Sequence, residues 1–143
     1  MNNRGFSLIE VVIVMTIMLL VGVSSSSFYA RFLTQNSVDN LSDQIAAQVR
    51  KAQLYAELGR FDGPWGVATR SGNLVLFKGT SYAARNAALD EKFTLNPAIS
   101  INGFTDVVFS QITGKPSSTP TITLSGRGVF KTITINSQGM VDR

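Results

Sequence analysis

The sequence predicts an α+β fold in which one long N-terminal helix packs on an antiparallel β-sheet. An apolar run covers residues 6–23, and an apolar stripe with helical spacing continues to residue 56. The rest of the chain consists of short alternating segments separated by turns that contain glycine, proline or asparagine. The chain has 143 residues, which is enough for one modest domain after the helix.

The apolar run Phe6–Val23 has 18 residues and a single charge, Glu10. A helix of that length, at about 1.5 Å per residue, can just cross about 30 Å of hydrocarbon. We therefore expect residues 6–27 to form a transmembrane helix. Arg4 precedes the run, which favours a cytoplasmic N-terminus and an exported body. An ionised carboxylate inside a membrane helix costs about 2.5–3.5 kcal/mol, which favours a functional role and a charged partner for Glu10.

The same stretch carries a family resemblance. Gly5-Phe6-Ser7-Leu8-Ile9-Glu10, followed by an unbroken apolar run, resembles the leader of type IV prepilins and of type II secretion pseudopilins. The resemblance implies that a prepilin peptidase removes residues 1–5 by cleaving between Gly5 and Phe6, and that the new N-terminus at Phe6 is methylated. It also implies an inner-membrane precursor whose body lies outside the cytoplasm. Its partners would be other pilin or pseudopilin subunits and the inner-membrane assembly platform, and it would end in a pilus or pseudopilus.

A second, amphipathic half of the helix is expected over residues 28–58. Its apolar stripe consists of Val38, Leu41, Ile45, Val49, Ala52, Tyr55 and Ala56, and polar side chains occupy the opposite face. We predict one helix from about Ser7 to Leu58, loosened near residues 22–27 and 35–37, where glycine, serine and asparagine gather. Gly59 is predicted to end this helix in a left-handed conformation.

Residues 59–143 are predicted to form a β-rich domain with one sheet of five to seven strands. The candidate segments are Trp65–Arg70, Leu74–Lys78, Phe93–Leu95, Ala98–Ile101, Val107–Ser110, Thr121–Ser125, Val129–Asn136 and Met140–Val141. A hairpin turn is expected at residues 71–73 and a short helical turn within residues 82–89. Because the helical stripe needs cover, we expect the apolar face of the sheet to pack on it.

The aromatic residues of the body are assigned to the interface between helix and sheet. They are Trp65, Phe77, Phe93, Phe104, Phe109 and Phe130, with Phe77 and Phe109 the firmest assignments. This architecture is that of the pilin fold. The body also resembles the GspH/FimT-type pseudopilin domain over residues 65–79, 107–114 and 132–141. The resemblance implies a minor pilin or an H-type pseudopilin.

The residue types argue against enzymatic chemistry. The chain has no histidine and no cysteine, which excludes an imidazole base, a thiolate nucleophile and a zinc site built from these residues. The acidic pairs Asp39/Asp43 and Asp90/Glu91 are interpreted as solvated polar surface. We therefore expect no catalytic residue, no metal site and no cofactor.

Glu10 has a specific predicted role. After cleavage, Phe6 would carry a cationic amine four residues before Glu10, and in a filament this carboxylate could pair with the Phe6 amine of a neighbouring subunit. Pairing removes much of the cost of burying either charge. In the alternative, Glu10 lies at the lipid–water boundary and reaches the headgroups. A chain that is never processed would be a single-pass, signal-anchored binding domain, and an ordinary signal peptide is a further alternative.

Basic residues raise the possibility of nucleic-acid binding. The net charge is +4, a mild excess that does not by itself require a polyanionic partner. Arg127 lies in the turn Gly126-Arg127-Gly128, and Lys131 follows closely. Some FimT-like minor pilins are DNA receptors in natural transformation, so both residues are candidate DNA contacts. In the alternative, this is an ordinary solvated turn.

Overall fold

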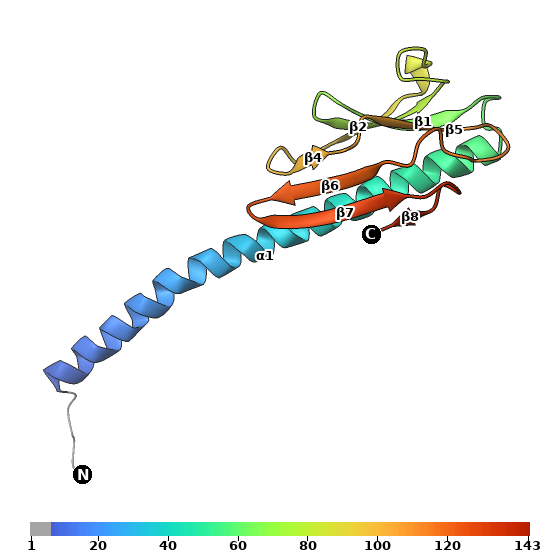
Figure 1. Cartoon of the computed structure of the whole chain (residues 1–143). Helices are drawn as coiled ribbons and strands as arrows, with labels where there is room; N and C mark the ends of the chain where they lie inside the picture. The colour runs from blue at the N-terminus through green and yellow to red at the C-terminus, as the bar shows by residue number, and fades with distance from the viewer. Residues whose placement is uncertain (1–6) are drawn as a thin grey trace, which may run out of the picture.

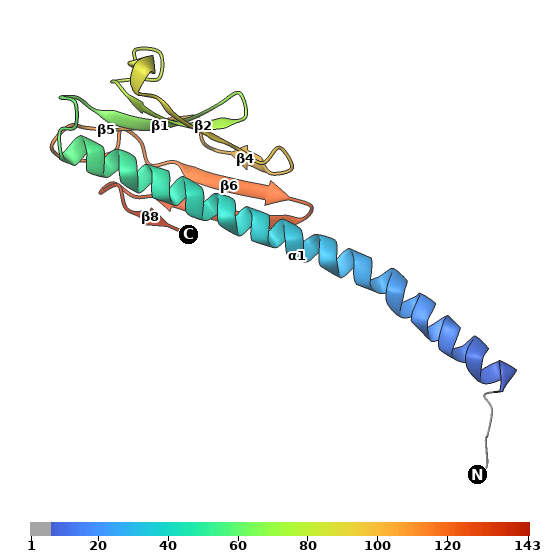
Figure 2. The ribbon, with the colours of Figure 1, turned by 180° about the vertical axis from the view of Figure 1, so that it is seen from behind.

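The computed structural model describes residues 7–143, apart from the side chains of residues 24–28, and shows one long helix with a β-rich body on its second half (Figures 1 and 2). Helix α1 covers Leu8–Glu57, 50 residues, or about 75 Å. It is continuous through residues 22–27 and 35–37, so the loosening expected there is absent. A gentle curve takes its place (Figure 1). The hydroxyls of Thr34 and Ser37 donate to the carbonyls of Ala30 and Leu33, a contact that bends helices without breaking them.

The predicted role of Gly59 at the end of α1 is confirmed. Its φ is +60°, and Leu58 before it is the last residue with a right-handed conformation. The Gly59 N–H donates to the Ala56 carbonyl at 3.1 Å, and the Arg60 N–H donates to the Tyr55 carbonyl at 2.9 Å. These two bonds form a Schellman motif, which satisfies carbonyls that the helix end would otherwise leave unpaired.

The α+β class is confirmed, but the body contains two antiparallel sheets where one was expected. The first has the order β3-β2-β1-β5, with β1 Trp65–Arg70, β2 Asn73–Lys78, β3 Glu91–Thr94 and β5 Asp106–Phe109. The second has the order β4-β6-β7-β8, with β4 Ser100–Asn102, β6 Thr121–Gly126, β7 Val129–Ile135 and β8 Val141–Asp142. The chain crosses between the sheets after β3, after β4 and after β5. The alternation of apolar and polar residues predicts the strands but does not predict which sheet each strand joins.

Two local expectations need adjustment. Arg70 pairs with Asn73, so the first hairpin has a two-residue turn, Ser71-Gly72, with φ of +48° and +73°. This is the geometry of the tight turns that match the twist of a hairpin. Within residues 82–89 only the short 3₁₀ helix η1, Ala87–Leu89, is formed.

The predicted stripe of α1 forms the main core of the body. Val38, Leu41, Ile45, Val49, Ala52 and Ala56 are all buried, together with side chains from both sheets. Trp65 of β1 fixes the far end of the helix, because its Nε1 donates to the Arg60 carbonyl at 2.8 Å and its ring meets Tyr55 edge-on at 5.0 Å. The helix is thus held along its second half by both sheets.

The predicted interface aromatics divide into three groups. Phe109 and Phe104 belong to the main core, and the partly buried Phe93 packs against it. Phe77 is buried on the opposite face of the first sheet, under Tyr82 at 5.6 Å, so its predicted contact with the helix is wrong. Phe130 is 72% exposed, and its assignment to the interface is also wrong. Both faces of β2 are apolar, so periodicity could not choose a face for Phe77; Phe130 lies on the outward-facing register of β7.

The four acidic residues interpreted as solvated surface all have basic partners. Lys131 pairs with Asp39 at 2.6 Å, Arg143 pairs with Asp43, Lys51 pairs with Glu91 at 2.5 Å, and Arg85 pairs with Asp90 at 2.9 Å. The Asp90 side chain is only 3% exposed. The hydrogen bond to Glu91 raises the pKa of Lys51, and the hydrogen bond to Asp90 raises the pKa of Arg85. The Asp39 and Asp43 side chains, which are 46% and 62% exposed, keep the surface position that the sequence predicted. The solvated interpretation is wrong for Asp90, which is buried beside Arg85.

Gly103 is a position where a side chain should strongly destabilise the body. Its φ is +77°, and a Cβ there would lie 2.2 Å from the Thr121 carbonyl oxygen. We expect Gly103→Ala to lower the free energy of unfolding by about 2–5 kcal/mol, because backbone strain adds to overpacking. Gly72→Ala is the matched control: its φ is +73° with open space around it, so about 1–2 kcal/mol of strain should remain. Urea denaturation of the full chain in mild detergent measures both free energies of unfolding. Equal losses in the two variants would contradict a clash between a Cβ at position 103 and the Thr121 carbonyl.

Candidate functional site

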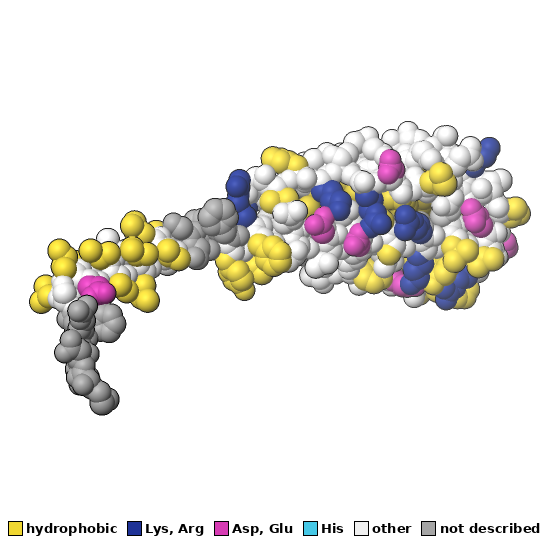
Figure 3. All heavy atoms as spheres, turned by 90° about the horizontal axis from the view of Figure 1, so that it is seen from below, with side chains coloured by type: hydrophobic (Ala, Val, Ile, Leu, Met, Phe, Trp, Pro, Cys, Tyr) yellow, Lys and Arg dark blue, Asp and Glu magenta, His cyan; other side chains and the backbone are white. Residues whose placement is uncertain are grey.

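The hydrophobic side chains that the structure describes over residues 8–23 of α1 are exposed. These large side chains are between 43% and 83% exposed, and they are Leu8, Ile9, Val11, Val12, Ile13, Val14, Met15, Ile17, Met18, Leu19, Leu20, Val21 and Val23. Figure 3 shows them around the projecting helix. Soluble monomers rarely expose a continuous apolar surface of this extent, so this surface is suited to contact with lipid or protein.

The membrane span predicted over residues 6–27 falls in this region. Among the described residues, the structure contains no helical stretch with the length and apolarity that a membrane crossing needs. The predicted span is therefore not confirmed.

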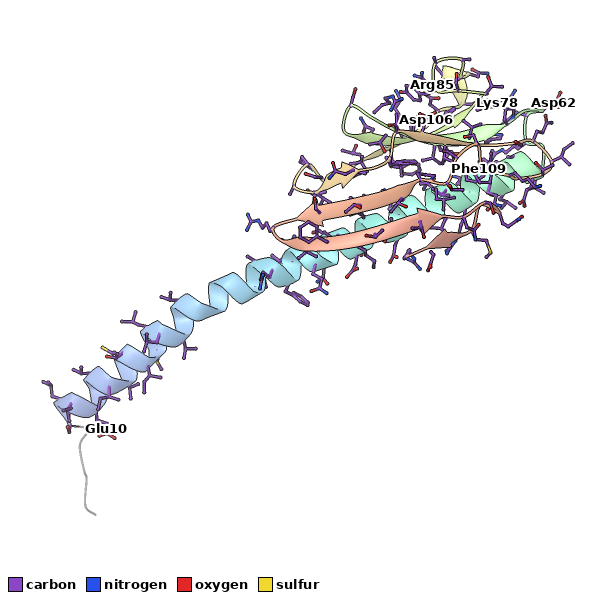
Figure 4. The ribbon with its side chains drawn as sticks, in the orientation of Figure 1. Glu10, Asp62, Lys78, Arg85, Asp106 and Phe109 are labelled. Atoms are coloured by element: carbon purple, nitrogen blue, oxygen red, sulfur yellow. The ribbon has the colours of Figure 1, made fainter. Side chains whose placement is uncertain are left out.

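Glu10 lies in the first turn of α1, at the end of the molecule opposite the body (Figure 4). Its side chain is exposed and its N–H donates to the Ser7 carbonyl at 3.1 Å. A carboxylate at this position is favoured by the partial positive charge of the helix N-terminus. Glu10 lines a shallow groove whose other side chains are all apolar, namely Val11, Val14, Met15 and Met18. A lone carboxylate on an apolar strip is arranged to receive one cationic group.

The predicted cleavage and methylation residues, Gly5 and Phe6, lie outside the described residues. The described chain begins at Ser7, which precedes the helix in an extended conformation and makes no side-chain cap bond. Cleavage and methylation therefore remain predictions as far as the geometry is concerned.

Comparison with protein families supplies the deciding observation for this end of the chain. Residues 1–26 match the prokaryotic N-terminal methylation motif. This chain carries the type IV pilin and pseudopilin signature. No match was found among curated proteins or solved structures. The pilin signature includes Gly5, Phe6 and Glu10 and ends within α1, so it says nothing directly about the body.

The two candidate DNA contacts lie beyond the pilin signature, on the hairpin of β6 and β7. Arg127 is exposed at its tip with φ +44°, a left-handed conformation. The Lys131 ammonium donates to Asp39 Oδ1 at 2.6 Å on α1. The structure therefore places Arg127 exposed at the tip, whereas Lys131 holds the hairpin to the helix.

Sequence reasoning missed a groove that Arg127 helps to form. We call it the neck groove; it has a volume of about 260 Å³ and is lined by Ala30, Leu33, Thr34, Ser37, Asn96, Ala98, Ile99 and Arg127. Three segments distant in sequence meet here: α1, the loop between β3 and β4, and the β6–β7 turn. A Cβ on Gly126 would lie 3.3 Å from both the Ala98 oxygen and Thr34 Cγ2, so the turn sits tightly on the other two segments. Only the basic turn itself could have been found from local sequence.

Proposed function

We propose that this chain is a structural subunit of a type IV pilus or type II secretion pseudopilus, specifically a minor pilin or an H-type pseudopilin. The observation that carries the proposal is the N-terminal methylation motif at residues 1–26, continuous with a helix whose second half is buried under a β-rich body. In this proposal prepilin peptidase cleaves after Gly5 and Phe6 is methylated. The chain then acts through assembly and performs no catalysis.

The exposed apolar surface of α1 supports a protein that moves from a lipid environment into a protein filament. Covering one aliphatic side chain contributes about 1.5–3 kcal/mol, so more than a dozen exposed side chains favour a strongly apolar environment. Before assembly the inner membrane supplies that environment, with the body outside the cytoplasm. In the filament, the helices of neighbouring subunits replace the lipid. The same surface thus serves for storage and for polymerisation.

Glu10 gives the assembly its axial register. Its carboxylate is the single charge among residues 7–23, and the four other side chains of its groove are apolar. The Phe6 amine that cleavage creates on a neighbouring subunit is the complementary charge. Moving the neighbour along the axis separates the two charges and leaves each unpaired in an apolar core, which is costly.

A DNA-binding minor pilin of natural transformation is the second candidate function. The exposed Arg127 favours it, because a guanidinium on a turn can reach a phosphate. Lys131 adds little, since Asp39 already holds its ammonium. One available cation on this hairpin is a small electrostatic footprint for a polyanion, so assembly remains the primary proposal.

A cysteine cross-linking experiment tests the assembly proposal. The chain contains no cysteine, so Met18→Cys places a single thiol on the strip that carries Glu10. In cells with the assembly machinery, mild oxidation should convert most of this variant into disulfide-linked dimers. Lys92→Cys, an exposed position on β3, should stay largely monomeric. Dimer yields for Met18→Cys no higher than for Lys92→Cys would refute packing through the first half of α1.

A further inference from the structure

The junction between the projecting helix and the body presents basic and hydrophobic side chains together (Figure 3). It consists of the neck groove, which Arg127 lines, and the exposed Arg31, which follows the lining residue Ala30 on α1. We propose that this junction binds the headgroup of an anionic phospholipid in the membrane that holds α1 before assembly. The inference rests on the proposed function, since it needs the first half of α1 to lie in a bilayer.

The position of the neck groove along α1 matches the level of the lipid headgroups. Leu8 to Tyr29 is a stretch of 22 residues, and at about 1.5 Å per residue it measures roughly 33 Å. The hydrocarbon core of a bilayer is about 30 Å thick, and the headgroup regions bring it to about 40–45 Å. The helical wall of the groove, residues 30–37, begins where the hydrocarbon ends. A phospholipid headgroup is thus the chemical group that this wall meets first.

Exposed aromatic side chains mark the same level. Tyr29 and Phe32 are 65% and 60% exposed on α1, and neither is covered by the body. Aromatic residues concentrate at the membrane–water interface, where the ring contacts acyl chains and the edge stays near water. Leu33, which is 47% exposed, extends this apolar surface into the groove. The order along the helix is therefore apolar run, aromatic pair, then groove.

The charges at the junction favour an anion. Arg31 and Arg127 are both exposed, and among the described residues neither has an ion-pair partner. The nearest acid along the helix, Asp39, is already bonded to Lys131. A guanidinium presents paired N–H groups that match the oxygens of a phosphate diester. The hydroxyl protons of Thr34 and Ser37 are already donated to helix carbonyls. The N–H groups of the arginines are therefore the donors that would bind a phosphate.

The groove walls favour a lipid over a nucleic acid. Among the side chains that the structure describes, Arg127 is the one charged group that lines the groove, and Ala30, Leu33 and Ile99 form an apolar floor. A nucleic acid backbone needs a track of several cations, whereas one lipid offers a single phosphate beside apolar chains. The combination of two cations, an apolar floor and an aromatic pair matches an anionic phospholipid.

Native mass spectrometry of the full chain in detergent micelles tests the inference. With equal amounts of phosphatidylglycerol and phosphatidylcholine present, we expect the wild type to retain phosphatidylglycerol at least five-fold more often. Arg31→Gln combined with Arg127→Gln should lower that preference to below two-fold. Lys115→Gln, with an exposed cation outside the neck groove, is the matched control and should keep the wild-type preference. Arg127→Lys, which keeps the charge, should retain most of it.

Three outcomes would overturn the inference. The wild type could show no preference for phosphatidylglycerol, or Lys115→Gln could lose the preference as fully as the double arginine variant does. In the third outcome, the double arginine variant loses salt-sensitive DNA retardation but still retains phosphatidylglycerol. The last outcome would assign Arg127 to nucleic acid. Circular dichroism of each variant shows whether it is folded. Filament incorporation is measured in parallel: a wild-type chain without lipid preference that still enters filaments removes only the lipid inference. A chain that never enters filaments removes the proposed function.

Discussion

Glu10→Ala is expected to lower incorporation of the chain into filaments at least about ten-fold, which corresponds to about 1.4 kcal/mol per subunit added. The reason is the amine on Phe6 of the neighbouring subunit, which would be buried without a counter-charge. Removing one partner of a buried ion pair typically costs about 3–5 kcal/mol, so ten-fold is a lower bound. Quantitative immunoblotting of sheared or sedimented filaments against the membrane fraction measures the effect.

Two variants sharpen this experiment. Glu10→Gln keeps the shape and removes the charge, so it should fail nearly as badly as alanine. Glu10→Asp keeps the charge on a shorter side chain and should recover part of the incorporation. The body should remain folded in all three, because Glu10 lies at the opposite end of α1 (Figure 4). Normal stoichiometry of Glu10→Gln in filaments would show that the charge has no assembly role.

Gly5→Val should cause the precursor to accumulate and should leave little or no mature chain. The peptidase must bring its catalytic groups to the bond between Gly5 and Phe6, and a branched side chain beside that bond obstructs the approach. Pulse-chase labelling with gel separation of precursor and mature chain measures the fraction cleaved. Because uncleaved chains lack the Phe6 amine, the variant should also be missing from filaments.

Gly22→Val is the control for this experiment. Gly22 lies in the apolar run that follows the cleavage site, and a Cβ at this position meets nothing within 4 Å in the described structure. A β-branched residue is accepted in a helix at small cost, so processing should match the wild type. If Gly22→Val and Gly5→Val were cleaved equally well, Gly5 would have no special place in processing.

The helix was the most predictable part of the fold because its signals are local. The stripe from Val38 to Ala56 repeats with helical spacing, and Gly59 occupies the position that needs a left-handed residue. The division into two sheets was not predictable in this way. Strand alternation shows which residues share a face, but not which strand pairs with which. For the same reason Phe77, on a strand with two apolar faces, was assigned to the wrong one.

The candidate site divides along the same line. The methylation motif is contiguous in sequence, so Gly5, Phe6 and Glu10 could be identified without a structure. The neck groove and the ion pairs of Asp39, Asp43 and Glu91 join residues that are far apart along the chain. Asp39 and Lys131 are 92 positions apart, and no local pattern connects them. Lys131 was named as a candidate DNA contact without its partner Asp39 for this reason.

Mass spectrometry of the mature N-terminus tests the central claim most directly. The purified chain from its native membrane or filament should begin at N-methylated Phe6, with residues 1–5 absent. That result would join cleavage, methylation and the charge partner of Glu10 in one observation. A chain that begins at Met1, or at a new terminus after the apolar run, would contradict the account and identify a signal-anchored or secreted protein.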